Sequence, residues 1–207
     1  VAPALAAGDT FVLKPSEITP HSTVHLVRIL AEAGLPDGVA NLVLGTGPGC
    51  GGPLSTDPRV DLVSFTGSLA VGRHLMAAAA PTVKRVALEL GGKNPNIVFA
   101  DADREAALDN AMTAVFLHSG QVCSAGARLL VEEAIADEFV DEIIRRARGI
   151  RLGGPFDDNA QSGPLTSEAH LRKVEGYVAA GIAEGARLRL GGERATEGAL
   201  ASGYYFP

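Results

Sequence analysis

The sequence has 207 residues, of which 46% are hydrophobic and 20% are charged, a composition that favours a packed core over a disordered chain. A formal net charge of -6 without any basic run argues against a surface that binds nucleic acid or an anionic membrane. No stretch approaches the roughly 20 apolar residues that span a membrane, and no basic-then-apolar leader opens the chain, so we expect a cytoplasmic protein.

The chain contains two cysteines, Cys50 and Cys123, which are too few for a disulfide framework or a zinc site. We therefore expect two free thiols in a reducing compartment and no bound metal. The first residue is Val1 rather than methionine, in a stretch that has the character of a helix end. We expect the sequence to be a segment of a longer protein.

Predicted strands and helices alternate along the chain. Short apolar runs predict strands at 11–14, 39–45, 60–67, 83–90, 96–100 and 127–133, and a last short strand at 187–192. Apolar residues at helical spacing predict helices at 22–34, 68–80, 103–118, 133–147 and 167–184. This alternation predicts an α/β fold with mainly parallel sheets. The turn at 91–95 is the most natural place to divide the chain.

The predicted helices carry end signals and apolar faces. We expect Ser22 to cap the first of them, and Gly34 with Pro36 to end it. The residues expected on the apolar faces of two later helices are Ala107, Ala111, Val115 and Phe116, and Ile135, Phe139, Ile143 and Ala147.

Residues 45–52 read Gly-Thr-Gly-Pro-Gly-Cys-Gly-Gly and formally match a dinucleotide fingerprint after a predicted strand. The standard unit places an acidic residue at the end of a following strand about 20 residues later, and none is found here. We therefore favour a simple glycine-rich turn over a standard phosphate-binding turn.

Ser-Phe-Thr-Gly-Ser at 64–68 joins a predicted strand to a predicted helix. Helix N-termini bind phosphate because they present free N–H groups and a positive partial charge, and Ser68 would add its hydroxyl. The alternative is an ordinary N-cap serine.

Lys14 and Glu17 follow the first predicted strand at its carboxyl end, where open α/β sheets bind their ligands. A lysine and a carboxylate at this place would bond ribose hydroxyls. The alternative is a solvated ion pair on the surface.

Glu89 stands between Leu88 and Leu90 at the end of an apolar strand. A carboxylate flanked by apolar groups has a raised pKa and makes a usable general base. The alternative is a strand residue that faces outward, since the leucines alternate with it.

Cys123 lies in the small, polar stretch Gly-Gln-Val-Cys-Ser-Ala-Gly at 120–126, whereas structural cysteines are usually buried among large apolar side chains. The thiol is therefore either a nucleophile or a free cysteine in a loop. His118 adds the alternative of a cysteine hydrolase, although a spacing of five residues across a turn does not establish the necessary geometry.

Taken in order, five stretches resemble the aldehyde dehydrogenase superfamily: LKPSE, GTGPG, SFTGS, LELGGKNPNIVFADAD and SGQVCSAGARLLV. The resemblance covers essentially the whole chain, including GPL at 163–165 and GYYFP at the end, and its Glu-Leu-Gly-Gly-Lys and Gly-Gln-x-Cys motifs are specific. It implies part of a variant Rossmann cofactor-binding domain at 1–90 and part of an α/β catalytic domain at 91–207.

The resemblance implies NAD(P)-dependent oxidation of a small-molecule aldehyde to a carboxylic acid. Cys123 matches the nucleophile, which forms a thiohemiacetal and, after hydride transfer to the nicotinamide, a thioester. Glu89 matches the general base that activates water to hydrolyse this thioester. The small residues around Cys123 would then leave the thiol accessible.

The resemblance also implies a set of cofactor-binding residues: Lys14, Glu17, Gly45, Thr66, Gly67, Ser68 and Leu90. Lys14 and Glu17 match the adenosine ribose contacts, and Ser68 the pyrophosphate contact. Because a glutamate disfavours a 2′-phosphate by charge repulsion, we expect NAD in preference to NADP. The resemblance also implies a homodimer or homotetramer when the protein is full length.

Two further alternatives stay open. One alternative is that the chain is an inactive segment on its own, because the family's oxyanion asparagine and the glutamate that holds the nicotinamide ribose lie outside it. An acylating, coenzyme-A-dependent relative is the other, and Glu89 argues against it. The sequence does not select one aldehyde.

Overall fold

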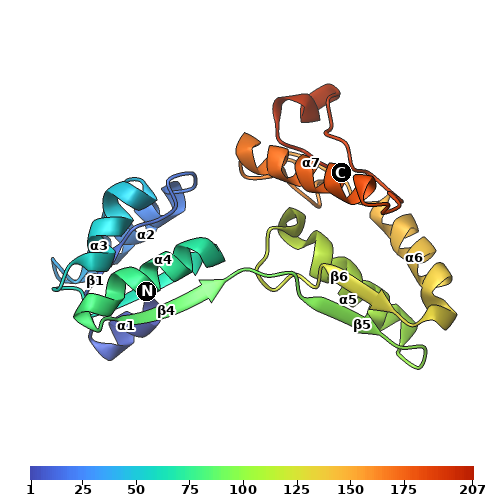
Figure 1. Cartoon of the computed structure of the whole chain (residues 1–207). Helices are drawn as coiled ribbons and strands as arrows, with labels where there is room; N and C mark the ends of the chain where they lie inside the picture. Colours follow the sequence, from blue (N-terminus) through green and yellow to red (C-terminus); the bar gives the residue numbers. More distant parts are fainter. The chain divides into compact units, whose positions relative to one another are not determined.

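The computed structural model describes all 207 residues, and the chain divides into two compact units, Val1–Leu90 and Gly91–Pro207 (Figure 1). Both units combine helices with parallel strands, which confirms the α/β class. The helices are all too short or too polar to span a membrane.

The first unit is built on two pairs of parallel strands. β1 (Phe11–Leu13) pairs with β2 (Ala40–Leu42), and β3 (Leu62–Gly67) pairs with β4 (Arg85–Leu90). Parallel neighbours need a crossover connection. For the first pair it contains α2 (His21–Glu32), and for the second α4 (Leu69–Ala79). A short helix, α1 (Ala2–Ala7), precedes β1.

The glycine-rich stretch after β2 forms a wide helical turn at Gly47–Gly51, which continues into α3 (Gly52–Thr56). Thr46 caps this turn because its Oγ1 accepts a hydrogen bond of 3.1 Å from the backbone N–H of Gly49. Pro53 lies in the first turn of α3, where a missing N–H removes no helical bond. A 3₁₀ turn at Ala80–Thr82 follows α4.

The second unit has one pair of parallel strands and three long helices. β5 (Pro95–Val98) pairs with β6 (Arg128–Val131), and α5 (Arg104–Phe116) connects them. The chain continues through α6 (Glu133–Ala147) and α7 (Glu168–Ala183). 3₁₀ turns occupy Leu117–Gly120 and Gly198–Ser202.

The core of the second unit lies between β5, α5 and α6 and contains Val98, Leu108, Ala111 and Phe139. Leu108 is fully buried and Phe139 is 2% exposed. Burying a side chain of this size contributes about 1.5–3 kcal/mol to folding. This core therefore fixes α5, whose carboxyl end leads toward Cys123.

The apolar face predicted for α6 is confirmed, since Ile135 and Ile143 pack against the core on either side of Phe139. The face predicted for α5 is partly wrong. Leu108 carries the packing, whereas Phe116 is 37% exposed. Phe116 is the last residue of the helix, and the chain leaves the core there.

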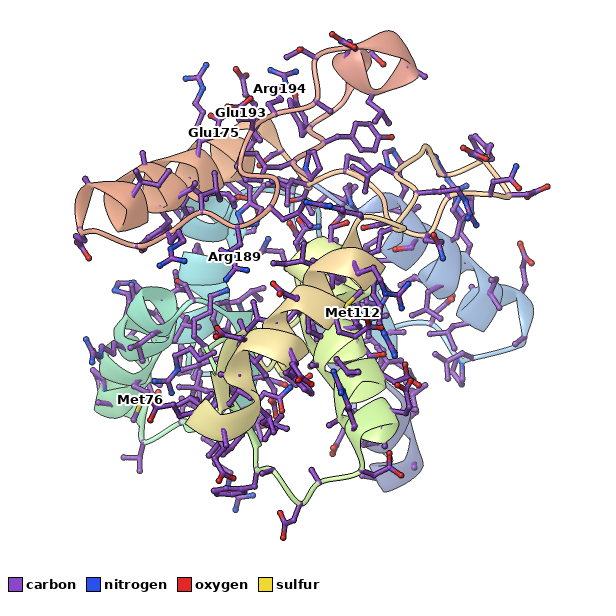
Figure 2. The ribbon with its side chains drawn as sticks, turned by 90° about the vertical axis from the view of Figure 1, so that its right-hand side faces the viewer. Met76, Met112, Glu175, Arg189, Glu193 and Arg194 are labelled. Carbon is purple, nitrogen blue, oxygen red and sulfur yellow. The ribbon has the colours of Figure 1, made fainter.

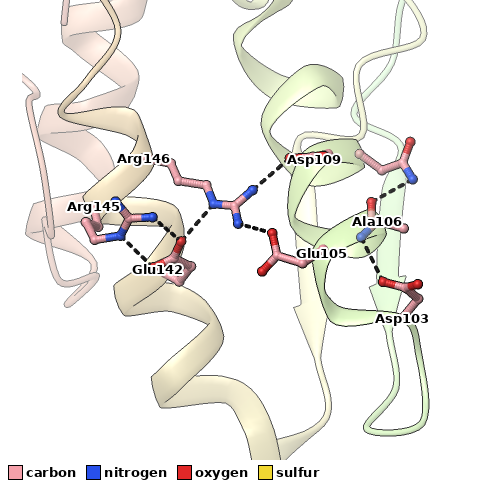
Figure 3. A network of polar contacts seen from close by, with 8 residues as sticks. Asp103, Glu105, Ala106, Asp109, Glu142, Arg145 and Arg146 are labelled. Carbon is pink, nitrogen blue, oxygen red and sulfur yellow. Dashed lines mark hydrogen bonds and ion pairs between the residues drawn. The ribbon is translucent and has the colours of Figure 1, made fainter.

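α5 and α6 are also joined by a charged network centred on Arg146 (Figure 3). The guanidinium of Arg146 donates to Glu142 of its own helix at 2.8 Å, and to Glu105 and Asp109 of α5 at 2.6 and 2.7 Å. Arg145 donates to Glu142 as well. Arg146 is 20% exposed and both carboxylates of α5 are well exposed, but several charges joined in one network contribute more than a single surface pair.

The strand predicted at 187–192 is not formed. Gly191 and Gly192 have positive φ values of 63° and 88°, which turn the chain out of an extended path, and the N–H of Gly192 donates to the carbonyl of Pro207. Arg189, labelled in Figure 2, instead donates to Asp141 of α6 at 2.8 Å. An apolar alternation forms a strand only where a neighbouring strand satisfies its backbone groups.

The predicted cap of α2 is also wrong. The helix begins at His21 with Pro20 in the N-cap position, and Ser22 lies inside the first turn. Proline suits a helix start because its fixed φ is already close to the helical value. Pro20 therefore takes the position that a serine usually fills.

Candidate active site

Cys123 lies on a tight turn between α5 and β6 in the second unit. The turn is closed by a hydrogen bond of 3.2 Å from the N–H of Ala125 to the carbonyl of Val122. Cys123 is exposed, whereas Ala125 and Gly126 are buried. The side-chain amide of Asn94 donates to the carbonyl of Cys123 at 3.2 Å. The thiol thus stands at the surface of the unit on a fixed backbone.

The glycines beside Cys123 have backbone roles. A Cβ on Gly126 would lie 3.1 Å from Cβ of Asn96 and 3.3 Å from Cβ of Ala114, so the turn packs closely against β5 and α5. Gly120 has a φ of 72°, a left-handed value that glycine adopts without strain. Small side chains here allow the turn itself to form.

A left-handed turn precedes the nucleophile turn. His118 (φ 50°, ψ 37°) and Ser119 (φ 57°, ψ 36°) both adopt the left-handed region, which is unusual for residues other than glycine. His118 is exposed, and no hydrogen bond joins its side chain to Cys123. The thiol–imidazole pair that a cysteine hydrolase needs is therefore absent from this turn.

The candidate residues of β3, β4 and α4 meet at one edge of the first unit. The register places Thr66 opposite Glu89 and Gly67 opposite Leu90, so both strands end together. Ser68 follows as the N-cap of α4, where its Oγ accepts a hydrogen bond of 3.3 Å from the N–H of Val71. This edge carries the free N–H groups of a helix start next to a carboxylate.

Glu89 does not have the apolar enclosure that we expected. Along β4 the half-buried residues alternate with exposed ones, and Glu89 lies on the exposed face. Leu88 and Leu90 point to the other side, where the side chain of Leu90 contacts Gly72 of α4 so closely that a Cβ there would lie 3.0 Å from it. Within its own unit, Glu89 is thus the outward-facing strand residue of the alternative interpretation.

Lys14 and Glu17 form a second cluster at the carboxyl end of β1. Lys14 Nζ lies 3.5 Å from Glu17 Oε2 and donates to the carbonyl of Gly45 at 3.2 Å. The hydrogen bond from its own backbone N–H holds the pKa of Glu17 below its ordinary value, and Lys14 and the Gly47 amide lower that pKa further. Glu17 is half exposed and carries its negative charge throughout the neutral range.

Gly45 joins this cluster because its carbonyl accepts from Lys14. A Cβ at Gly45 would collide with the sulfur of Cys50, whose thiol points to the carbonyl of Leu44 at 3.7 Å. Only glycine therefore fits this turn while Cys50 keeps its place.

The whole chain, residues 1–207, matches the model of the aldehyde dehydrogenase family. The chain belongs to this family. This match confirms the resemblance inferred from the sequence motifs. The parallel strands and the exposed cysteine agree with it.

Several relatives of known name are similar to this aldehyde dehydrogenase chain. Betaine aldehyde dehydrogenase of Bacillus subtilis (strain 168) is 55% identical over 206 residues, which is 100% of the chain and 42% of that protein. The crystal structure of betaine aldehyde dehydrogenase from Staphylococcus aureus in complex with NAD⁺ has a TM-score of 0.96 and 47% identity, covering 99% of the chain and 41% of that structure.

HpcC from Thermus thermophilus is equally close, with a TM-score of 0.96 and 48% identity over 99% of the chain and 41% of that structure. A double mutant of the S. aureus enzyme, in complex with NAD⁺, carries a BME-modified cysteine. The chain therefore spans about two fifths of the length of these relatives.

Sequence reasoning missed the residues that support the nucleophile turn. Asn94 bonds the carbonyl of Cys123, and Gln121 and Ser119 bond a segment more than forty positions away. The motifs Gly-Gly-Lys-Asn-Pro and Gly-Gln-x-Cys contain two of these residues. No local pattern, however, indicates which distant backbone groups their amides reach.

Proposed function

We propose that the protein that contains this chain oxidises an aldehyde to a carboxylic acid with NAD as the hydride acceptor. The family match over all 207 residues carries this proposal, because it comes with an exposed cysteine on a fixed turn. We further propose that residues 1–90 contribute to cofactor binding and residues 91–207 to the nucleophile.

Cys123 is the proposed nucleophile. Its thiolate attacks the aldehyde carbon, a C–S bond forms, and the carbonyl oxygen takes up negative charge in a thiohemiacetal. The exposed position of the thiol and the hydrogen bond that holds its carbonyl support this role. The backbone N–H of Cys123 is suited to stabilise the charged oxygen.

Glu89 is the proposed general base. When the cysteine carries an acyl group, Glu89 removes a proton from water, the hydroxide attacks the thioester carbon, and the C–S bond breaks. The carboxylic acid leaves and the thiolate of Cys123 is restored. The place of Glu89 opposite Thr66, at the edge that also carries Ser68 and the start of α4, supports this role.

The residues of the first unit fit a dinucleotide. Glu17 is charged and would accept hydrogen bonds from the adenosine ribose beside Lys14, while Ser68 and the start of α4 would hold the pyrophosphate. Thr66, Gly67, Gly45 and Leu90 would line the same cofactor site. Bound NAD would supply the acceptor for the hydride that leaves the thiohemiacetal carbon.

Glu89→Gln tests the two-step chemistry. Without a base at this position, hydrolysis of the thioester slows, and kcat should fall by about 10²- to 10⁴-fold. Intact-mass spectrometry after incubation with aldehyde and NAD should show one acyl group on Cys123. Glu32→Gln, an exposed glutamate at the end of α2, is the matched control and should turn over normally.

Normal turnover of Glu89→Gln without an acyl intermediate would contradict the assignment of Glu89.

Betaine aldehyde is the first substrate to test, because two of the similar proteins are named for it. We propose a homodimer or homotetramer as the assembled form, to be checked by light scattering on the full-length protein.

A further inference from the structure

The left-handed turn before Cys123 requires support from outside itself. Two consecutive residues other than glycine, His118 and Ser119, adopt left-handed backbone angles. Each such residue costs of order 1–3 kcal/mol and persists only where the surroundings determine its conformation. The contacts around the turn must therefore determine its conformation.

Gln121 makes these bonds with both ends of its side-chain amide. Its Nε2 donates to the carbonyl of His118 at 3.2 Å and to the carbonyl of Pro164 at 3.4 Å. Its Oε1 accepts from the N–H of Thr166 at 3.0 Å. One amide thus connects the left-handed turn to a segment 43 to 45 residues later in the chain.

Ser119 adds a second connection to the same segment. Its Oγ donates to the carbonyl of Gly163 at 2.7 Å and lies 3.0 Å from Oγ of Ser162. We name residues 162–166 the support segment.

The support segment is anchored in turn. Leu165 is 7% exposed, and its N–H donates to the carbonyl of Tyr204 at 3.0 Å. The carbonyl of Ser162 accepts from the N–H of Gly153 at 3.1 Å. A chain of contacts therefore runs from Tyr204, which precedes the buried Tyr205, through the support segment and Gln121 to the turn before Cys123.

We propose that Gln121 is a positioning residue for Cys123, acting through the support segment. The proposal rests on the proposed function of Cys123. It assigns a role to Gly-Pro-Leu at 163–165, to which the proposed function gives none. Gln121 fixes the path of the chain two residues before the nucleophile, so its loss displaces the sulfur relative to the aldehyde without touching the cofactor residues.

Gln121→Glu removes the amide donor and keeps an acceptor for Thr166. A carboxylate then faces the carbonyls of His118 and Pro164, which repel it. A protonated carboxyl could still donate to one of them. We expect kcat to fall by about 10- to 100-fold, as for a nucleophile displaced by a fraction of an ångström to about 1 Å, with an unchanged KM for NAD.

The pH profile separates positioning from a general loss of structure. The ratio of the variant's kcat to that of the wild type should rise as the pH falls toward the pKa of the new carboxyl, because protonation restores one donor. Asn110→Asp is the matched control. Asn110 donates one side-chain hydrogen bond, to Ala106 within α5, and its loss should leave kcat and its pH profile unchanged.

Hydrogen exchange gives a readout that does not depend on aldehyde oxidation. In full-length Gln121→Ala, amides in 118–124 and 163–166 should exchange about tenfold faster than in the wild type, and those in Asn110→Asp should not. Unchanged exchange, or faster exchange with unchanged kcat in both Gln121 variants, would overturn the proposal. If the wild type oxidises no aldehyde, the proposed function fails, and the exchange experiment still decides whether Gln121 holds the turn.

Discussion

Cys123 combines an exposed side chain with a firmly held backbone. The carbonyl of Cys123 accepts from Asn94, and the turn before it is bonded by Gln121 and Ser119. A nucleophile needs both properties, since the sulfur must meet a substrate and must do so at a fixed angle. Both amides precede Cys123 in the sequence, Asn94 by 29 residues and Gln121 by two.

Glu17 is the residue on which we expect cofactor preference to depend. Its pKa is held below the ordinary value by its own backbone amide and by Lys14, so the carboxylate is charged at neutral pH. Glu17→Gln should raise the ratio of kcat/KM for NADP to that for NAD by about tenfold, because like-charge repulsion of the 2′-phosphate is removed.

Steady-state kinetics with both cofactors measures this ratio, with Glu32→Gln as the control on the same unit. An unchanged ratio in Glu17→Gln would mean that other residues select the cofactor.

The identity of the candidate site residues could be predicted from the sequence, but the burial and backbone angles of several of them could not. Glu89 was found from its place between two leucines, yet its side chain is exposed, because alternation along a strand sends neighbours to opposite faces. The capping role of Ser68 followed directly from its place before a helix. The left-handed angles of His118 and Ser119 were not predictable, because they depend on bonds to residues 162–166.

At the scale of elements, Arg146 adds a charged connection between α5 and α6 to their shared apolar core. The bonds from Arg145 and then from Arg146 lower the pKa of Glu142 to about 2. A carboxyl with a lowered pKa contributes stability above its unfolded-state value, and this contribution is lost as the pH falls through the folded-state value. The network should therefore stabilise the unit at neutral pH and fail between about pH 4.5 and pH 2.

Arg146→Ala should lower the Tm of the protein by a few degrees at neutral pH, and the difference from the wild type should shrink as the pH falls below 4.5. Arg104→Ala is the matched control. Arg104 also joins α5 to α6, but through one pair at 3.2 Å in which Arg104 is 56% exposed, and such pairs contribute little. Equal effects of the two substitutions on Tm would contradict the role of the network.

Helices and strands could be predicted from the sequence where a local pattern of apolar residues was enough to determine them. The apolar stripe of α6 predicted its packing through Phe139. Residues 187–192 had the same strand pattern as real strands, but glycines with positive φ and a side-chain bond to α6 direct that segment elsewhere. Pairing partners for strands are set by the tertiary fold, so a local pattern overpredicts them.

At the scale of the whole molecule, the chain divides at Leu90, directly after the proposed base, and the proposed nucleophile lies in the other unit. The match over residues 1–207 establishes the family of the chain, whereas the reaction is a proposal about the longer protein that contains it. The proposal requires residues of both units in successive steps, so it is best tested on the full-length protein.

The decisive measurement is the formation of reduced cofactor by the full-length protein with NAD and a panel of aldehydes, betaine aldehyde first, beside the Cys123→Ser variant. The account predicts reduced cofactor from the wild type with at least one aldehyde, and none from Cys123→Ser although it still binds NAD. Equal reduction by both proteins, or no reduction with any aldehyde by a folded wild type that binds NAD, would contradict it.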